Sequence, residues 1–169
     1  MKILITGANG FIGSYLASFF LNQNKEVIAT SRQFHISTRT LLNKATLIDL
    51  DVLDKSALRQ LSVDADVIIH TATANDIISK DVLKGIELSA AGTKNMLDFA
   101  VQNNIPKVLI FSTLQVYGTE LTGIINENAP LYYQNDYGLN HLFGEMYAEL
   151  YARQEKVQTV SVRPSNVYG

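Results

Sequence analysis

Short apolar runs alternate along the chain with longer segments in which apolar residues recur at helical spacing. The short runs are rich in Ile, Val, Leu and Thr, a composition typical of strands that are buried on both faces of a sheet. They predict strands over Lys2–Thr6, Glu26–Ser31, Thr46–Asp51, Asp66–Ala72, Lys107–Thr113 and Thr159–Pro164.

The longer segments between these runs predict helices. One begins at Phe11 and repeats apolar residues at helical spacing. A short helix is expected over Asp54–Leu61 with Asp54 as its N-cap, and longer ones over Ile86–Asn103 and Tyr137–Arg153. A repeating β-α order of this kind predicts an α/β fold: a doubly wound, Rossmann-like parallel sheet of about six strands with helices on both faces. Gly118–Asp136 is the one long irregular stretch.

Composition narrows the class of protein. The 169 residues suffice for one domain, and a net charge of −2 without a Lys/Arg run gives no support for a nucleic-acid partner. The absence of cysteine excludes disulfides, a thiolate zinc site and a cysteine nucleophile, and no metal site is predicted. No apolar stretch approaches the ~20 residues of a membrane span, so a cytoplasmic protein without a membrane partner is expected.

A glycine-rich turn follows the first predicted strand and opens the first helix. In Thr6-Gly7-Ala8-Asn9-Gly10-Phe11-Ile12-Gly13, the first glycine permits a tight turn and the second permits close approach of a pyrophosphate. The third, Gly13, permits close packing of helix and strand. The helix N-terminus would offer free N–H groups and a positive dipole end to phosphates.

The spacing Thr-Gly-x-x-Gly-x-x-Gly resembles the short-chain dehydrogenase/reductase superfamily. The form found here is similar to its extended branch of nucleotide-sugar epimerases, dehydratases and reductases. The resemblance continues through the segments 51–54, 66–72, 111–118 and 163–169 and covers almost the whole chain. It implies that residues 1–169 form the NAD(P)-binding domain. It also implies a further, mostly helical substrate lobe that the printed sequence does not contain.

The resemblance assigns cofactor contacts to particular residues. Asp51 would hydrogen-bond the adenine amino group with Val52 beside the ring, and the end of the fourth strand would line the cofactor. The cofactor-binding residues expected are Gly7, Asn9, Gly10, Phe11, Ile12, Gly13, Ser31, Arg32, Asp51, Val52, Thr71, Ala72 and Pro164.

The end of the second strand bears on the choice between NAD and NADP. An acidic residue there binds the ribose 2′-hydroxyl, whereas a basic residue accommodates a 2′-phosphate. This chain has Ser31 followed by Arg32, whose guanidinium could grip a phosphate with two hydrogen bonds. The sequence therefore favours NADP over NAD, with a solvated loop arginine as the alternative.

The resemblance makes Tyr137 the group that moves the substrate hydroxyl proton. Thr113 would hydrogen-bond the same substrate oxygen, and Ser112 is the reserve candidate. The family places a lysine one helical turn after the tyrosine, and this chain has His141 there. A histidine is mostly neutral at pH 7, so it would help tyrosine ionisation less. Three interpretations stay open: His141 replaces the lysine, another residue supplies the charge, or little chemistry occurs.

Two other departures affect the expected function. Ser89 stands where the family usually has an asparagine that supports the site. Leu114 and Gln115 replace an Asp-Glu pair that dehydratases of this branch often carry, so dehydration is the least favoured reaction. Glu87, Tyr117 and Glu145 are interpreted as structural or solvated. Asn166 either borders the substrate, as the resemblance implies, or caps a turn.

The expected function is reversible hydride transfer on a small-molecule nucleotide sugar, by an NAD(P)-dependent epimerase or ketoreductase. The rival hypothesis is a non-catalytic dinucleotide-binding or regulatory module, or an inactive part of such an enzyme. Self-association into a homo-oligomer is expected if the surface that faces the substrate lobe is exposed.

Overall fold

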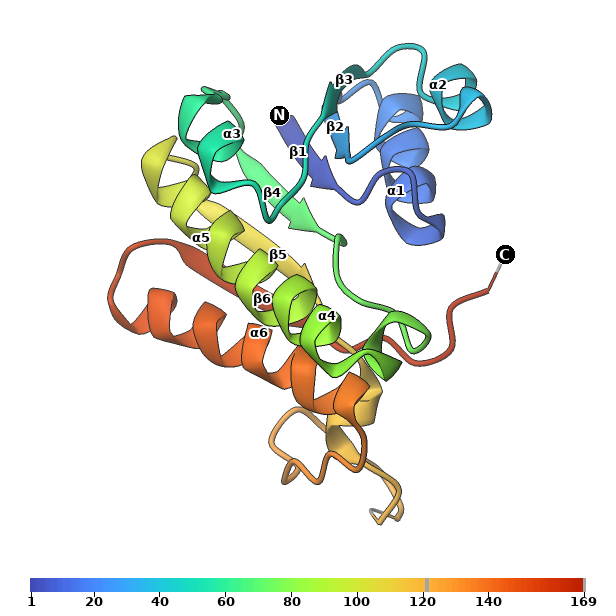
Figure 1. The fold of residues 1–169 in the computed structure, drawn as a ribbon, viewed down its shortest axis with the longest axis vertical. Coiled ribbons are helices and arrows are strands. Elements are labelled where there is room, and N and C mark those ends of the chain that lie inside the picture. The colour runs from blue at the N-terminus through green and yellow to red at the C-terminus, as the bar shows by residue number, and fades with distance from the viewer. Residues whose placement is uncertain (121, 169) are drawn as a thin grey trace.

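The computed structural model describes residues 1–120 and 122–168. Leu121, within the long irregular stretch, and Gly169, the last residue of the resembled 163–169 segment, lie outside the described residues. The chain forms one parallel sheet in the order β3-β2-β1-β4-β5-β6 (Figure 1). The strands are β1 Lys2–Thr6, β2 Glu26–Ser31, β3 Thr46–Asp49, β4 Val67–His70, β5 Lys107–Phe111 and β6 Gln158–Val162.

Helices connect the strands. They are α1 Phe11–Asn22, α2 Ile36–Leu41, α3 Lys55–Gln60, α4 Val82–Ile86, α5 Gly92–Gln102 and α6 Asp136–Arg153. Single turns are the 3₁₀ segments η1 Ile78–Lys80 and η3 Leu114–Tyr117 and the π-helical turn η2 Glu87–Ala91. In Figure 1, α5 and α6 lie side by side over one face of the sheet, while α1 and α2 lie on the other side.

Both faces of the sheet are buried, as a parallel sheet requires. Alternate residues of β1 point to opposite cores: Ile3 and Ile5 pack with α1, whereas Leu4 packs with α3, α5 and α6. All three side chains are fully buried. This two-sided burial explains why the strands appear in the sequence as continuous apolar runs rather than alternating ones.

The predicted fold is confirmed, and β1, β2 and the Asp54 N-cap are found where expected. Asp54 accepts hydrogen bonds from the N–H groups of Ser56 and Ala57. Four strand predictions need correction at their ends: β3, β4, β5 and β6 each stop two residues before the predicted end. Beyond those points the chain leaves the ladder and lines cavities at the strand ends.

One helix prediction also needs correction, and one helix was missed. The helix predicted over Ile86–Asn103 begins earlier, at Val82, and is interrupted by the π-helical turn η2. The short helix α2 was not predicted. Within the described residues, no helix is long and apolar enough to cross a membrane.

Candidate active site

Two cavities open at the carboxyl ends of the strands. The strand order reverses between β1 and β4, and ligands of doubly wound sheets bind at such a reversal. The smaller cavity, about 270 Å³, is lined by the glycine turn and the ends of β2 and β3. The larger, about 540 Å³, is lined by residues from β5, η3, α6 and the segment after β6. Thr71 and Thr73 line both, so the cavities adjoin.

The glycine turn has the geometry that its sequence predicts. Gly7 has φ +70°, which favours glycine, and a Cβ there would lie 2.8 Å from the backbone nitrogen of Ala72. A Cβ on Gly13 would lie 2.4 Å from the carbonyl oxygen of Gly7. The turn, α1 and the segment after β4 therefore approach one another too closely for any side chain at these two positions.

The N-terminus of α1 faces this turn and is suited to an anion. Gly10 caps the helix without a side-chain hydrogen bond, and the first turn holds no acidic residue. The Asn9 side chain is engaged elsewhere, because its Oδ1 accepts a hydrogen bond of 3.0 Å from the His35 N–H. Free backbone N–H groups and the positive end of the helix dipole favour a phosphate here.

The residues predicted to hold the adenosine lie around the smaller cavity. Ser31, Arg32, Asp51 and Val52 all line it. Asp51 Oδ1 accepts a hydrogen bond of 2.9 Å from the Leu53 N–H, and Val52 O accepts one of 2.9 Å from Asn95 Nδ2. These bonds fix the segment after β3 against α5. Ser31 Oγ donates to Gln33 O at 3.2 Å.

The start of α6 is held against η3, and this brings the predicted catalytic residues to one cavity. Asn135 caps α6 by accepting from the Gly138 N–H at 2.8 Å, and its Nδ2 donates to Gln115 Oε1 at 2.8 Å. A Cβ on Gly138 would lie 2.7 Å from the Gln115 carbonyl oxygen, so only glycine allows this approach. Tyr137 and Thr113 consequently line the same cavity.

The two hydroxyl residues at the end of β5 are buried at the cavity wall. Thr113 Oγ1 accepts a hydrogen bond of 3.2 Å from the Gln115 N–H, which leaves its own O–H able to donate. Ser112 Oγ has no hydrogen-bond partner among the described residues. Both side chains line the larger cavity, as do Ile12, Pro164 and Asn166.

His141 lies one helical turn after Tyr137, with the two ring centroids 4.6 Å apart at an interplanar angle of 66°. It lines the larger cavity but is only 4% exposed, and its Nε2 lies 3.0 Å from Ala74 O. Burial lowers the pKa of His141, and the Ala74 and Phe111 carbonyls with the Glu145 charge only partly oppose this effect. The imidazole is therefore neutral near pH 7.

Another histidine, to which the sequence assigned no role, directly precedes the cavity-lining Thr71. His70 ends β4, is fully buried, and its Nδ1 lies 2.7 Å from Thr6 Oγ1. Burial, with a smaller contribution from the charge of His141, lowers the pKa of His70 to about 3. A single histidine in an apolar strand gave no signal that it would meet Thr6, which lies on another strand.

A second group of polar residues braces the catalytic end from the side of β6. Arg163 donates to both carboxylate oxygens of Glu145, and its Nη1 donates to the Tyr117 hydroxyl at 2.6 Å. The guanidinium also lies over the Tyr117 ring, 4.9 Å from its centroid. The interpretation of Tyr117 and Glu145 as structural agrees with these contacts, which join η3, α6 and the end of β6.

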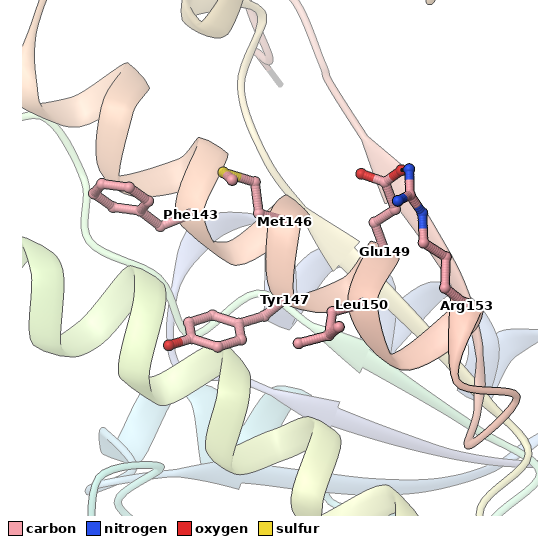
Figure 2. A pocket seen from close by; sticks show the side chains of 6 residues that line it. All are labelled: Phe143, Met146, Tyr147, Glu149, Leu150 and Arg153. Atoms are coloured by element: carbon pink, nitrogen blue, oxygen red, sulfur yellow. Dashed lines mark hydrogen bonds and ion pairs between the residues drawn. The ribbon is translucent and has the colours of Figure 1, made fainter.

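A further cavity lies on the outer face of α6, away from these residues. Figure 2 shows its lining, in which Phe143, Met146 and Leu150 project from the helix and Glu149 pairs with Arg153. Its volume is about 450 Å³. Neither Thr113 nor Tyr137 reaches it, so it is not part of the candidate site.

Comparison with known proteins identifies the family. The model of the "NAD dependent epimerase/dehydratase family" matches residues 3–169. The chain belongs to this family. The members that it resembles are longer, and the chain spans about half the length of the curated relatives it matches.

Individual epimerases of the family resemble the chain in sequence and fold. A putative UDP-glucose 4-epimerase of Methanocaldococcus jannaschii is 30% identical over 99% of this chain and 56% of its own length. The UDP-glucuronic acid 4-epimerase of Bacillus cereus, solved with NAD, is 29% identical with a TM-score of 0.86, covering 100% of this chain and 57% of that one. The UDP-glucose 4-epimerase of Thermotoga maritima shares the fold, with a TM-score of 0.91 and 23% identity. The match covers 100% of this chain and 57% of that one.

Proposed function

We propose that this chain binds a nicotinamide dinucleotide across the two adjoining cavities and serves reversible hydride transfer on a nucleotide sugar. One observation carries the proposal: the glycine turn and the Thr113–Tyr137 pair, far apart in sequence, line cavities that share Thr71 and Thr73. One end of this site suits a pyrophosphate, and the other suits proton transfer to a hydroxyl or carbonyl oxygen.

The residues present fit the cofactor. A side chain at Gly7 or Gly13 would collide with the backbone around the phosphate turn. Gly10, the N-cap of α1, leaves the N-terminus of the helix open to phosphate oxygens. Phe11, Ile12 and Asn9 complete the phosphate turn, Asp51 and Val52 would hold the adenine, and Thr71, Ala72 and Pro164 would line the remainder. When bound, the nicotinamide ring accepts a hydride from a sugar carbon and can return it.

The chain's own residues would move the proton. Tyr137 would take the proton of the sugar hydroxyl as the carbon is oxidised and return it on reduction. The free O–H of Thr113 would donate a hydrogen bond to the same sugar oxygen. His141 lies against the Tyr137 ring, and because it is neutral it would support this geometry rather than supply a positive charge.

Epimerisation of a UDP-sugar is the reaction to test first, and reduction of a keto-sugar is the second. The similarity to named UDP-sugar 4-epimerases supports this order. Leu114 and Gln115 offer no acid for the elimination of water, and Gln115 is already bonded to Asn135. Dehydration therefore stays the least favoured reaction.

The preference for NADP is part of the proposal. Arg32 lines the smaller cavity and is exposed, and Ser31 beside it carries no charge that would repel a 2′-phosphate. The Bacillus cereus relative was solved with NAD, so comparison of the two cofactors on this chain is the relevant measurement. Cytoplasmic location and self-association remain predictions.

The test is titration of the chain with NAD and with NADP, followed through the backbone amide signals of Gly10, Phe11 and Gly13. Saturable shifts in these signals, absent in a Gly13→Ala variant, support cofactor binding. Unmoved signals with both dinucleotides would overturn the proposal. A panel of UDP-sugars then tests turnover, and binding without turnover by any longer form of the protein favours the non-catalytic module.

A further inference from the structure

Two buried side chains hold the same backbone residue from opposite sides. The Ala74 N–H donates a hydrogen bond of 3.0 Å to Ser89 Oγ, and the Ala74 carbonyl oxygen lies 3.0 Å from His141 Nε2. Ala74 and Ser89 are 1% exposed and His141 is 4% exposed. We propose that Ser89 and His141 are positioning residues that clamp Ala74 and thereby fix the segment Thr71–Asp76 between the two cavities.

The clamped segment forms a shared wall of the candidate site. Thr71 and Thr73 line both cavities, while Asn75 and Asp76 line the larger one. Ala74 itself is buried and lines neither cavity. Holding its backbone therefore sets the positions of the residues on either side, which would face the cofactor and the substrate.

The two clamping residues come from elements in direct contact. Ser89 lies in the π-helical turn η2, and π turns occur often at functional sites. A Cβ on Gly144 of α6 would lie 2.9 Å from Ser89 O, and Thr93 Oγ1 donates to the same oxygen at 2.6 Å. The helix that carries Tyr137 and His141 is thus packed on the turn that carries Ser89.

The chemistry of the contact defines the state of His141. A carbonyl oxygen only accepts, so Nε2 carries the hydrogen. The groups that act on the ring include Tyr137, Glu145 one turn further along α6, His70 of β4 and the Phe111 carbonyl. In this arrangement His141 needs only an N–H directed at Ala74 O, and it does not need a charge.

Ser89 and His141 are also two of the positions at which the chain departs from the pattern that it resembles. Their side chains meet at one residue, so the two departures form one structural unit. That the clamp serves catalysis depends on the proposed function, whereas the clamp itself can be measured in the cofactor-free protein.

The test is amide hydrogen exchange of Ala74, relative to the core amide of Ile5, in the whole chain. We expect Ser89→Ala and His141→Leu each to raise the relative exchange rate of Ala74 by about tenfold, because each removes a buried hydrogen bond. Both bonds hold the same residue, so their effects should not multiply. The relative exchange rate of Ala74 in the double variant should therefore be well below the product of the two single-variant increases. Ser79→Ala, which removes a buried hydroxyl that has no partner in the described part of the chain, is the matched control.

His141→Gln separates positioning from charge. Glutamine keeps an N–H donor of similar reach and does not titrate, so it should restore Ala74 protection to within about twofold of the wild type. Two results would overturn the clamp. One is exchange of Ala74 that is as fast in His141→Gln as in His141→Leu. The other is exchange that is unchanged in both Ser89→Ala and His141→Leu. Neither result depends on whether the chain is an enzyme.

Discussion

Gly13 lies so close to Gly7 that a methyl group on Gly13 would be 2.4 Å from the carbonyl oxygen of Gly7. Gly13→Ala must therefore displace α1 from the phosphate turn. We expect the free energy of unfolding to fall by about 2 kcal/mol, as in other overpacked sites. Dinucleotide binding should be lost, because the N–H groups at the helix start move. Urea unfolding and calorimetric titration check the two effects.

Gly123→Ala is the control for this prediction. Gly123 has a positive φ, unlike Gly13, and a Cβ there would meet none of the described atoms within 4 Å. Its replacement should cost about 1 kcal/mol of backbone strain and leave dinucleotide affinity unchanged. Equal affinity losses in the two variants would mean that the close approach of Gly13 to Gly7 has no specific part in binding.

Tyr137→Phe removes the proposed proton-transfer hydroxyl while keeping the ring that lies against His141. We expect turnover of a UDP-sugar to fall by about 100-fold or more, with the dissociation constant of the dinucleotide nearly unchanged. Tyr133→Phe, at a half-exposed position outside the cavity lining, is the control and should keep full activity. Retained turnover in Tyr137→Phe would remove Tyr137 from the mechanism.

Arg32→Ala tests the cofactor preference. If the guanidinium binds a 2′-phosphate, the affinity for NADP should fall by about tenfold while that for NAD stays the same. Arg59→Ala, which removes an exposed arginine of α3 away from the smaller cavity, should alter neither affinity. A preference for NAD in the unmodified chain would contradict the electrostatic argument.

Glu145→Gln tests the brace between α6 and the end of β6. Arg163 donates to both oxygens of this carboxylate, which is buried, and the contact raises the pKa of Arg163. Removal of the negative charge leaves the Arg163 guanidinium without its anionic partner, Glu145. We therefore expect a loss of about 3 kcal/mol in the free energy of unfolding. Glu149→Gln, at an exposed pair on the same helix, should cost less than about 0.5 kcal/mol.

The burial of His70 predicts how stability depends on pH. The unfolded chain takes up a proton on this residue below about pH 6.5, whereas the folded chain resists protonation until its pKa of about 3. The contribution of neutral His70 to the free energy of unfolding is therefore fully present above pH 6.5. It is lost as the pH is lowered toward 3. The lowered pKa of His141 acts in the same direction.

His70→Asn checks this assignment, because the amide can still bond to Thr6 but does not titrate. The free energy of unfolding, measured with urea at pH 7.5, 6, 5 and 4, should fall less steeply with decreasing pH for this variant than for the wild type. The exposed His35, replaced by Asn, is the control and should leave the decline unchanged. An unaltered slope in His70→Asn would assign the acid sensitivity to other groups.

Local pattern predicted much of the fold because the central strands of the sheet are buried on both faces. The continuous apolar runs mark β1 and β2 to the residue, and the glycine spacing marks the phosphate turn. Strand ends were less predictable, since Leu50 and Asp51 follow strand residues directly but leave the ladder to line a cavity. Helix α2 escaped prediction because Ile, Ser, Thr, Arg, Thr and Leu form a poor helix sequence.

The candidate site was predictable by position and not by contact. The sequence placed Tyr137, Thr113 and His141 near one another through the resemblance. It gave no means of seeing that His141 would bond to Ala74, which lies 67 residues earlier, or that Ser89 would bond to the same residue. Such pairings depend on how helices dock across the sheet, and no local periodicity encodes them.

The histidines of this chain are placed as natural spectroscopic probes. There are only three, and no tryptophan. His70 is bonded to Thr6 just before the phosphate turn, His141 lines the larger cavity, and the backbone of His35 is bonded to Asn9 of the phosphate turn. Imidazole resonances of unlabelled protein would therefore report separately on the phosphate and sugar ends of a bound molecule. A library of dinucleotides and sugar nucleotides could be screened through three signals, without isotope enrichment.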